Sequence, residues 1–172
     1  MRCLAHLGYT AQYMTDTVSY RLMKPGEEEE AFAMVERAFN AFVRDGFSPD
    51  GVKECCRSMR DNVFTQRSDH FILVAESGGH IVGMIGMKEY DHVSMFFVEP
   101  SRMGEGIGRG LFTRAVTLCQ QEKPDLKEIE VHSSPWAVAI YEKLGFSATG
   151  PEREEGGLRY TRMVKTLEPQ SG

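Results

Sequence analysis

The sequence predicts an α/β protein of the α+β kind, with a mixed, largely antiparallel central sheet flanked by helices on both faces. Segments with strand-like alternation and segments with helical spacing follow one another in the order β-α-α-β-β-β-α-β-α-β-β. Two strands in the middle of the chain are joined by a tight turn, which favours antiparallel pairing. The length of 172 residues fits one domain, and no internal repeat divides it.

The N-terminal region predicts an arm, a strand and a helix. Residues 1–17 contain no long apolar run, so we expect a loose arm there. Residues 18–23 alternate in character and end before a proline, as a strand does. The acidic run 27–30 then opens a helix, because carboxylates stabilise the positive end of a helix dipole. Its buried face is marked by apolar residues at helical spacing, namely Phe32, Val35, Phe39 and Phe42.

The next part of the chain predicts one helix and three strands. A Ser-Pro-Asp sequence suits a helix start, and this helix covers residues 49–62. Segments 70–76 and 81–87 are strands joined by the glycine-containing turn 77–80, so they form a hairpin. A third strand over 92–98 is rich in β-branched and aromatic residues.

Strand 92–98 leads into a glycine-rich turn. Pro100 ends ladder pairing on its own nitrogen, and an apolar helical pattern begins at Ile107. Glycine recurs through the turn, at residues 104, 106, 108 and 110. A helix start leaves N–H groups unpaired and carries partial positive charge, and glycine lets a ligand approach this backbone. The pattern therefore indicates a phosphate or pyrophosphate site, although glycines also form turns that bind nothing.

The remaining elements are shorter. Residues 129–131 centre a strand, and residues 137–144 form a helix that a glycine caps at its end. Segments 146–149 and 158–164 are the last two strands, and residues 168–172 are a polar tail.

Two common nucleotide-binding motifs do not fit the glycine turn. A dinucleotide-binding turn needs G-x-G-x-x-G, and Arg109 stands where the third glycine belongs. A P-loop needs a lysine followed by serine or threonine, and no such pair follows these glycines.

With these residues in view, the chain resembles the GNAT superfamily of N-acetyltransferases over roughly residues 18–167. The family pattern V-x-P-x-x-[RQ]-G-x-G-[IVL]-[GA] is matched by Val98, Pro100, Gly104, Gly106, Ile107 and Gly108. Met103 departs from it, with Arg102 one residue earlier. A second family pattern, N-x-x-A-x-x-x-Y-x-K-x-G-F, is matched by Ala137, Tyr141, Lys143, Gly145 and Phe146, while Ser134 replaces the asparagine.

The resemblance implies a GNAT-like fold, acetyl-CoA as cosubstrate and an amine as acceptor. It implies that Tyr141 protonates the leaving thiolate and that the backbone N–H of Val98 stabilises the oxyanion. A tyrosine that is only packed in the core is the alternative for Tyr141. The implied cofactor-binding residues are Phe97, Val98, Met103, Gly104, Glu105, Gly106, Ile107, Gly108, Arg109, Ser134 and Tyr141.

The catalytic base stays open between several groups, which are His92, His132, Glu89, Glu99 and an ordered water. A histidine titrates near the working pH. His92 lies six positions before Val98 on one strand, so both side chains share a face if no bulge intervenes. We therefore place His92 with Tyr141 and Val98 among the catalytic residues, while a bulge would reverse this facing.

Composition argues against several other classes. A content of 41% hydrophobic and 26% charged residues suits a globular protein, and the net charge of −5 disfavours nucleic acid as a partner. The four cysteines lack metal-ligand spacing, so we expect no metal site and reduced thiols in the cytoplasm. No segment has the pattern of a transmembrane helix or a signal peptide, so we expect no membrane partner.

The sequence therefore favours an acetyl-CoA-dependent N-acetyltransferase that acts on a primary amine of a small molecule or protein. A non-catalytic acyl-CoA-binding sensor or regulatory module is the alternative. Tyr141 favours the enzyme, because a binding module needs no proton donor there. The identity of the acceptor and the formation of a homodimer stay open, since one fold serves many acceptors.

Overall fold

The computed structural model describes residues 17–65 and 69–168, so most of the expected arm 1–17 and of the tail 168–172 lies outside the described residues. The strands are β1 (Ser19–Leu22), β2 (His70–Ser77), β3 (His80–Lys88), β4 (His92–Val98), β5 (Glu128–Ser133), β6 (Ser147–Ala148), β7 (Arg153–Glu155) and β8 (Leu158–Thr166). The helices are α1 (Glu28–Phe42), α2 (Pro49–Phe64), α3 (Ile107–Glu122) and α4 (Val138–Lys143), with short 3₁₀ turns η1 (Arg44–Gly46), η2 (Pro100–Arg102) and η3 (Pro135–Ala137).

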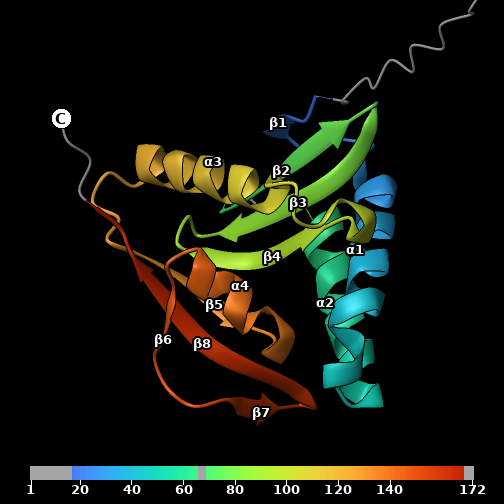
Figure 1. The fold of residues 1–172 in the computed structure, drawn as a ribbon, viewed down its shortest axis with the longest axis vertical. Helices are drawn as coiled ribbons and strands as arrows, with labels where there is room; N and C mark the ends of the chain where they lie inside the picture. Colours follow the sequence, from blue (N-terminus) through green and yellow to red (C-terminus); the bar gives the residue numbers. More distant parts are fainter. Residues whose placement is uncertain (1–16, 66–68, 169–172) are drawn as a thin grey trace, which may run out of the picture.

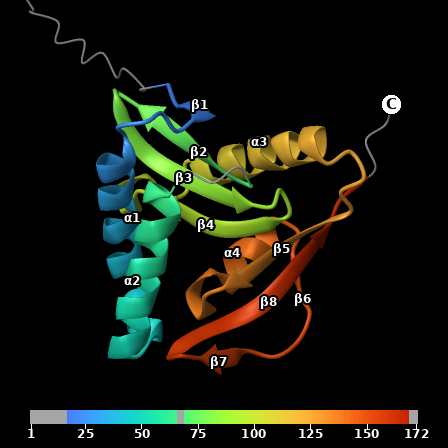
Figure 2. The ribbon, with the colours of Figure 1, turned by 180° about the vertical axis from the view of Figure 1, so that it is seen from behind.

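The predicted fold class is confirmed. The strands form one sheet in the order β1-β2-β3-β4-β5-β8-β6, and β7 pairs with β8. Helices α1 and α2 cover one face of the sheet, whereas α3 and α4 cover the other (Figures 1 and 2). Each face has its own apolar core, because alternate residues of the central strands point to opposite sides. No helix in the described part of the chain is long and apolar enough to cross a membrane.

The sheet opens between β4 and β5. These two strands are parallel, and their register contains only the pairs His92–Glu130 and Val93–Val131. Beyond Val93 the strands separate, whereas β5 stays paired with β8 along its whole length. The separation leaves one edge of β4 without a neighbouring strand in the middle of the sheet.

A β-bulge interrupts β4 near its start. The register with β3 shifts between Gly86 and Met87, which leaves Ser94 as the extra residue on β4. As a result, Val93 packs on the α3 face and Met95 packs on the α1–α2 face, although they are two positions apart.

Strand β7 was not predicted. It is short, exposed and entirely charged in sequence, so it carries no hydrophobic pattern to identify it. The turn that joins it to β8 contacts the start of α2, where the backbone N–H of Ser48 donates to the carbonyl oxygen of Gly157 at 3.3 Å. Gly51 permits this approach, because a Cβ atom there would lie 2.1 Å from the same oxygen. Both views show the β7–β8 hairpin reaching α2 (Figures 1 and 2).

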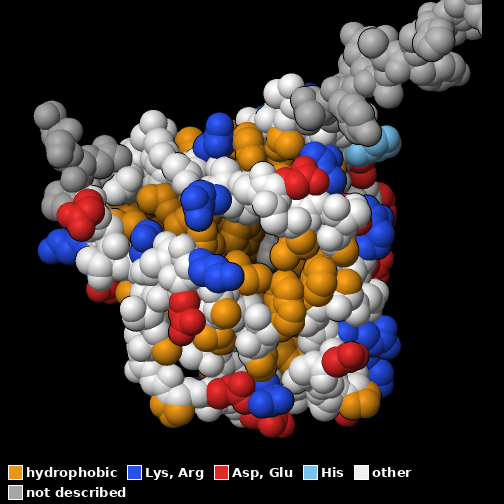
Figure 3. Space-filling model, viewed as in Figure 1, with side chains coloured by type: hydrophobic (Ala, Val, Ile, Leu, Met, Phe, Trp, Pro, Cys, Tyr) orange, Lys and Arg blue, Asp and Glu red, His pale blue; other side chains and the backbone are white. Residues whose placement is uncertain are grey.

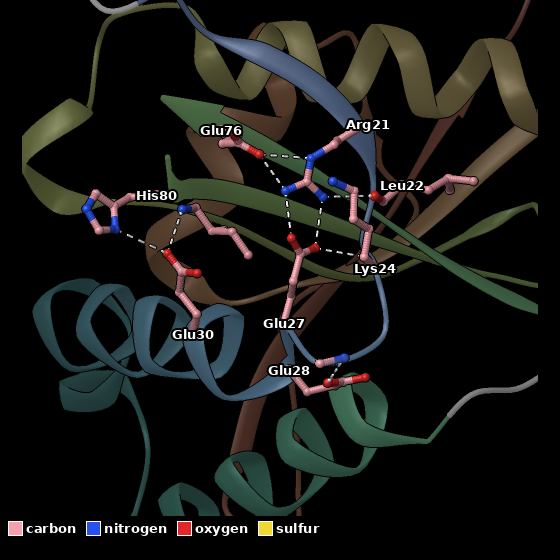
Figure 4. A network of polar contacts seen from close by, with 10 residues as sticks. Arg21, Leu22, Lys24, Glu27, Glu28, Glu30, Glu76 and His80 are labelled. Atoms are coloured by element: carbon pink, nitrogen blue, oxygen red, sulfur yellow. Dashed lines mark hydrogen bonds and ion pairs between the residues drawn. The ribbon is translucent and has the colours of Figure 1, made fainter. Parts of the chain in front are cut away.

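The acidic run at the start of α1 forms specific contacts besides complementing the helix dipole. Figure 4 shows Arg21 between Glu27 of this run and Glu76 of β2. Its guanidinium donates to Glu27 at 2.7 Å and, through Nε, to Glu76 at 2.9 Å. The hydrogen bond from Arg21 lowers the pKa of Glu27 to about 2. Glu30 accepts from the backbone N–H of Ile81 at 3.0 Å, so the run ties α1 to three strands.

Candidate active site

A cavity of about 920 Å³ lies where β4 and β5 separate. Its walls come from the glycine turn and the start of α3, from α4, from α1 and α2, and from the β7–β8 hairpin. Figure 3 shows hydrophobic side chains gathered in the hollow between the α1–α2 pair and the α4–β8 side. Every expected cofactor-binding residue except Glu105 lines this cavity. Glu105 instead forms an ion pair with Arg102 at 2.7 Å.

The glycine turn presents backbone N–H groups to the cavity. Gly106 precedes α3 with φ of 81°, a left-handed conformation that favours glycine. The first hydrogen bond of the helix runs from the N–H of Gly110 to the carbonyl of Gly106 at 2.9 Å. The N–H groups of residues 107–109 therefore have no partner within the described chain. Arg109 and Lys143 also line the cavity, and neither is ion-paired with a described residue, so this end can hold an anion.

The separated edge of β4 presents a further N–H group. The N–H of Glu99 donates to the carbonyl of Val82 at 2.9 Å, toward β3. Since N–H groups alternate between the two edges of a strand, the N–H of Val98 points to the opposite edge, toward β5. The cavity lies there, and Val98 lines it.

Tyr141 lies on α4 beside this edge. Its side chain is buried, with ring centroids 6.1 Å from Phe96 of β4 and 5.3 Å from Phe146. No group in the described ranges forms a hydrogen bond with its hydroxyl, although the residue lines the cavity. Burial raises the pKa of Tyr141 above its ordinary value, so the hydroxyl keeps its proton at neutral pH and can donate a hydrogen bond into the cavity.

Two histidines and a glutamate meet at the point where β4 and β5 begin to separate. The Nε2 atom of His132 lies 3.2 Å from Glu130 Oε1, and the Nδ1 atom of His92 lies 3.9 Å from the same oxygen. The two imidazole centroids are 5.2 Å apart. A guanidinium from Arg162 completes the cluster and lowers the pKa of Glu130. Burial, followed by the nearby His132, lowers the pKa of His92, so His92 is neutral at neutral pH.

The expected facing of His92 is wrong. The bulge at Ser94 reverses the alternation, so His92 and Val98 point to opposite faces of β4. His132 lines the main cavity, whereas His92 lines a second hollow of about 770 Å³ on the α1–α2 face. His132 and Ser94 line both hollows, so His92 is connected to the main cavity through its neighbours.

The other candidate bases lie elsewhere. Glu99 forms an ion pair with Arg37 of α1 at 2.7 Å. Glu89 sits in the β3–β4 turn, 3.5 Å from the ammonium of Lys88, and lines only the second hollow. Cys55 does line the main cavity, but burial raises the pKa of its thiol to about 12, which makes it a weak nucleophile. No group of three or more metal-ligating side chains occurs among the described residues.

Sequence analysis did not identify the aromatic residues at the end of the cavity farthest from the glycine turn, although the family resemblance implies that the region 46–62 lines the acceptor pocket. Phe42 fits the helical pattern of α1 and was expected to be buried, but it is half-exposed and stacks on Trp136 of η3, with centroids 4.6 Å apart. Leu158 and Tyr160 of β8 contribute the opposite wall. A cluster of aromatic residues at the end of α1 was the available signal, and it was interpreted as core.

Comparisons with known proteins agree with this geometry. The sequence profile described as Acetyltransferase (GNAT) domain matches residues 43–167. No curated protein sequence matches this chain. A GCN5-related N-acetyltransferase from Rhodopseudomonas palustris superposes with a TM-score of 0.73 at 22% identity, covering 90% of this chain and 99% of that one.

Two further solved structures share the fold. The PaiA N-acetyltransferase of Thermoplasma acidophilum, solved in complex with coenzyme A, has a TM-score of 0.71 at 15% identity, covering 88% of this chain and 99% of that one. YjaB from Escherichia coli has a TM-score of 0.65 at 24% identity, covering 87% and 97%. The profile match spans most of the chain, and this protein belongs to the GNAT acetyltransferase family.

Proposed function

We propose that the protein is an N-acetyltransferase that uses acetyl-CoA to acetylate a primary amine. One observation carries the proposal: a protonated tyrosine, an outward N–H group of β4 and the unpaired N–H groups of α3 all face one cavity. Such groups suit acyl transfer from a thioester, which requires an anion site, a stabilised oxyanion and a protonated leaving thiolate.

The residues present fit acetyl-CoA. The N–H groups of residues 107–109 would hold the pyrophosphate, and Arg109 would add a charge-assisted contact. The Ser134 hydroxyl would bind the pantetheine arm. Acetyl-CoA would supply an activated acetyl group at the end of that arm. The coenzyme A complex of the PaiA structure supports this use of the fold.

Two groups of the chain would act on the reacting atoms. The N–H of Val98 would donate to the thioester oxygen as negative charge develops there. The Tyr141 hydroxyl would give its proton to the departing thiolate. Its place in the cavity wall beside the outer edge of β4 supports this role.

For the base, we propose that His132 accepts the proton of the acceptor ammonium, since it lines the cavity and contacts Glu130. His92 keeps a supporting role: it would exchange the proton with solvent through the second hollow. Glu130 would orient both rings, because its carboxylate faces a nitrogen of each.

The test is thiol release from acetyl-CoA across a panel of amines. Amine-dependent release supports the enzyme. Tight acetyl-CoA binding with no release above the rate without amine would favour the alternative, an acyl-CoA sensor. The free thiols of Cys55, Cys56 and Cys119 suit a reducing compartment, which supports the cytoplasm as the proposed location.

A further inference from the structure

We infer that the acceptor is a small amine with a single ammonium group on an apolar, aromatic-bearing body. This inference rests on the proposed acetyl transfer and assigns the acceptor to the end of the cavity between α1, α2 and β8. The amine would lie near His132, and its body would extend away from the glycine turn.

The walls at this end are apolar. They are formed by side chains of α1, the η1–α2 loop, α2, β4 and β8, among them Phe39, Phe47, Met59, Met95, Phe97 and Leu158. Phe39, Met59 and Met95 are nearly inaccessible to solvent, so they form a fixed floor rather than a mobile surface. An apolar body would displace water from this surface, and each buried methylene would contribute about 0.8 kcal/mol.

Aromatic rings are concentrated at this end of the cavity. Phe42 of α1 stacks on Trp136 of η3 at an interplanar angle of 13°, and Phe39 and Phe47 are 6.2 Å apart. Tyr160 of β8 stacks on His132 with centroids 4.8 Å apart. A ligand ring at this end would therefore have stacking and edge partners, which adds to simple burial.

The charges of the cavity disfavour a second ammonium. Arg109 and Lys143 line the glycine-turn end, where they suit phosphates and repel cations. At the other end, Glu155 is the one carboxylate among the described lining residues, and it is exposed on β7. A diamine or polyamine would place its second charge mainly against apolar walls, with the exposed Glu155 as its one carboxylate partner among the described lining residues, which is costly. A single ammonium has the opposite advantage, because an apolar site lowers its pKa and favours the neutral nucleophile.

The β7–β8 hairpin limits the size of the acceptor. Its turn contacts the start of α2 through the hydrogen bond between Ser48 and Gly157 and through the close approach at Gly51. The hairpin therefore joins the two sides of the cavity at this end. This bridge narrows the end of the cavity, which favours a free small molecule over a segment of a folded protein.

The experiment compares amines in matched pairs, measuring kcat/KM by thiol release. Hexylamine and 1,5-diaminopentane have the same number of non-hydrogen atoms, and they differ in a terminal methyl against an ammonium. Phenethylamine and ethylamine differ in the aromatic ring. We expect hexylamine to exceed the diamine, and phenethylamine to exceed ethylamine, each by about 10²-fold. The inference would be overturned if 1,5-diaminopentane reacted as fast as hexylamine or faster. It would also be overturned if a lysine-containing peptide reacted as fast as phenethylamine or faster.

A pair of variants tests whether the preference for an aromatic amine arises at the acceptor end of the cavity. Trp136→Ala should reduce kcat/KM for phenethylamine by about 10-fold and leave the KM for acetyl-CoA unchanged, because the ring stacks at the acceptor end. Leu22→Ala is the matched control, since this exposed apolar residue of β1 lies outside the cavity. Undiminished phenethylamine kinetics in Trp136→Ala would contradict the assignment. If the proposed acetyl transfer itself is wrong, the result is different: no amine should cause thiol release from acetyl-CoA in the wild type or in any variant.

Discussion

The two ends of the cavity are built in different ways. The glycine-turn end comes from one continuous stretch, residues 98–109, and presents backbone N–H groups at the start of α3. The acceptor end is assembled from side chains of α1, α2, η3 and β8, which are far apart in the sequence. A site formed by backbone N–H groups tolerates replacement of side chains. Met103 is an example, because the family pattern has arginine or glutamine at this position. A side-chain site changes its ligand with each substitution, so the same fold can keep its donor and vary its acceptor.

The largest effect should follow from damage to the backbone end. Gly106→Val places a β-branched residue at φ of 81°, which forces the turn to rearrange and displaces its N–H groups. We expect acetyl-CoA affinity to fall by about 10²-fold or more, measured by calorimetry on the folded variant.

Gly79→Val is the control for backbone strain. Gly79 has φ of 82° in the β2–β3 turn, away from the cavity, so this variant should lose stability but keep acetyl-CoA affinity. Equal affinities in the Gly106 and Gly79 variants would remove the glycine turn from the binding site.

Tyr141 lies between the two ends of the cavity, and its substitution should change the reaction rate rather than the binding of acetyl-CoA. Tyr141→Phe keeps the ring and removes the buried proton donor. The expected result is a fall in kcat of about 10²-fold with an unchanged dissociation constant for acetyl-CoA. Tyr20→Phe removes a hydroxyl from a tyrosine outside the cavity and should have no effect on kcat. A Tyr141→Phe enzyme with full kcat would assign this residue to packing.

The histidine cluster lies between the main cavity and the second hollow, and its two rings should differ. We expect His132→Gln to lower kcat/KM by about 10-fold and to abolish the acidic limb of its pH profile, because the base is lost. His92→Gln should slow the reaction less, since His92 lines only the second hollow.

A direct readout accompanies this pH profile. His132 is one cause of the lowered pKa of His92, so the pKa of His92 measured by NMR should rise in His132→Gln. An intact acidic limb in His132→Gln would transfer the role of base to a water molecule or another group.

The smallest effect should come from a polar cluster outside both ends. Arg21→Met removes the partner of Glu27, whose pKa is lowered from 4.5 to about 2 in the folded protein. A carboxylate with a lowered pKa stabilises the fold above pH 4.5, and this contribution disappears as the pH falls through 2. Urea unfolding at pH 7 should show a loss of about 1 kcal/mol, which shrinks in acid.

Lys53→Met is the comparison for this cluster. It breaks the exposed pair between Lys53 and Asp50, whose side chains are 80% and 89% accessible, and should leave stability unchanged. Acetyl-CoA affinity should match the wild type in both variants. A constant difference between Arg21→Met and wild type from pH 7 to pH 2 would contradict the ion-pair origin of the effect.

The sequence by itself determined most of the secondary-structure elements and the glycine-turn end of the cavity. Alternation and helical spacing located most strands and helices, because each pattern reflects a local periodicity of burial. The expected strand over 92–98 coincides with β4, and α3 begins at Ile107 as expected. The glycine turn is equally local, since left-handed glycines and a helix start are properties of consecutive residues.

The tertiary structure alone decided the bulge, the hairpin and the acceptor end. The bulge at Ser94 depends on how β4 aligns with β3, and a single inserted residue reversed the predicted facing of His92. Strand β7 has three charged residues and forms only by pairing with β8. The apolar end of the cavity requires α1, α2, η3 and β8 to meet, and no local pattern distinguishes a ring that lines a cavity from one that fills a core.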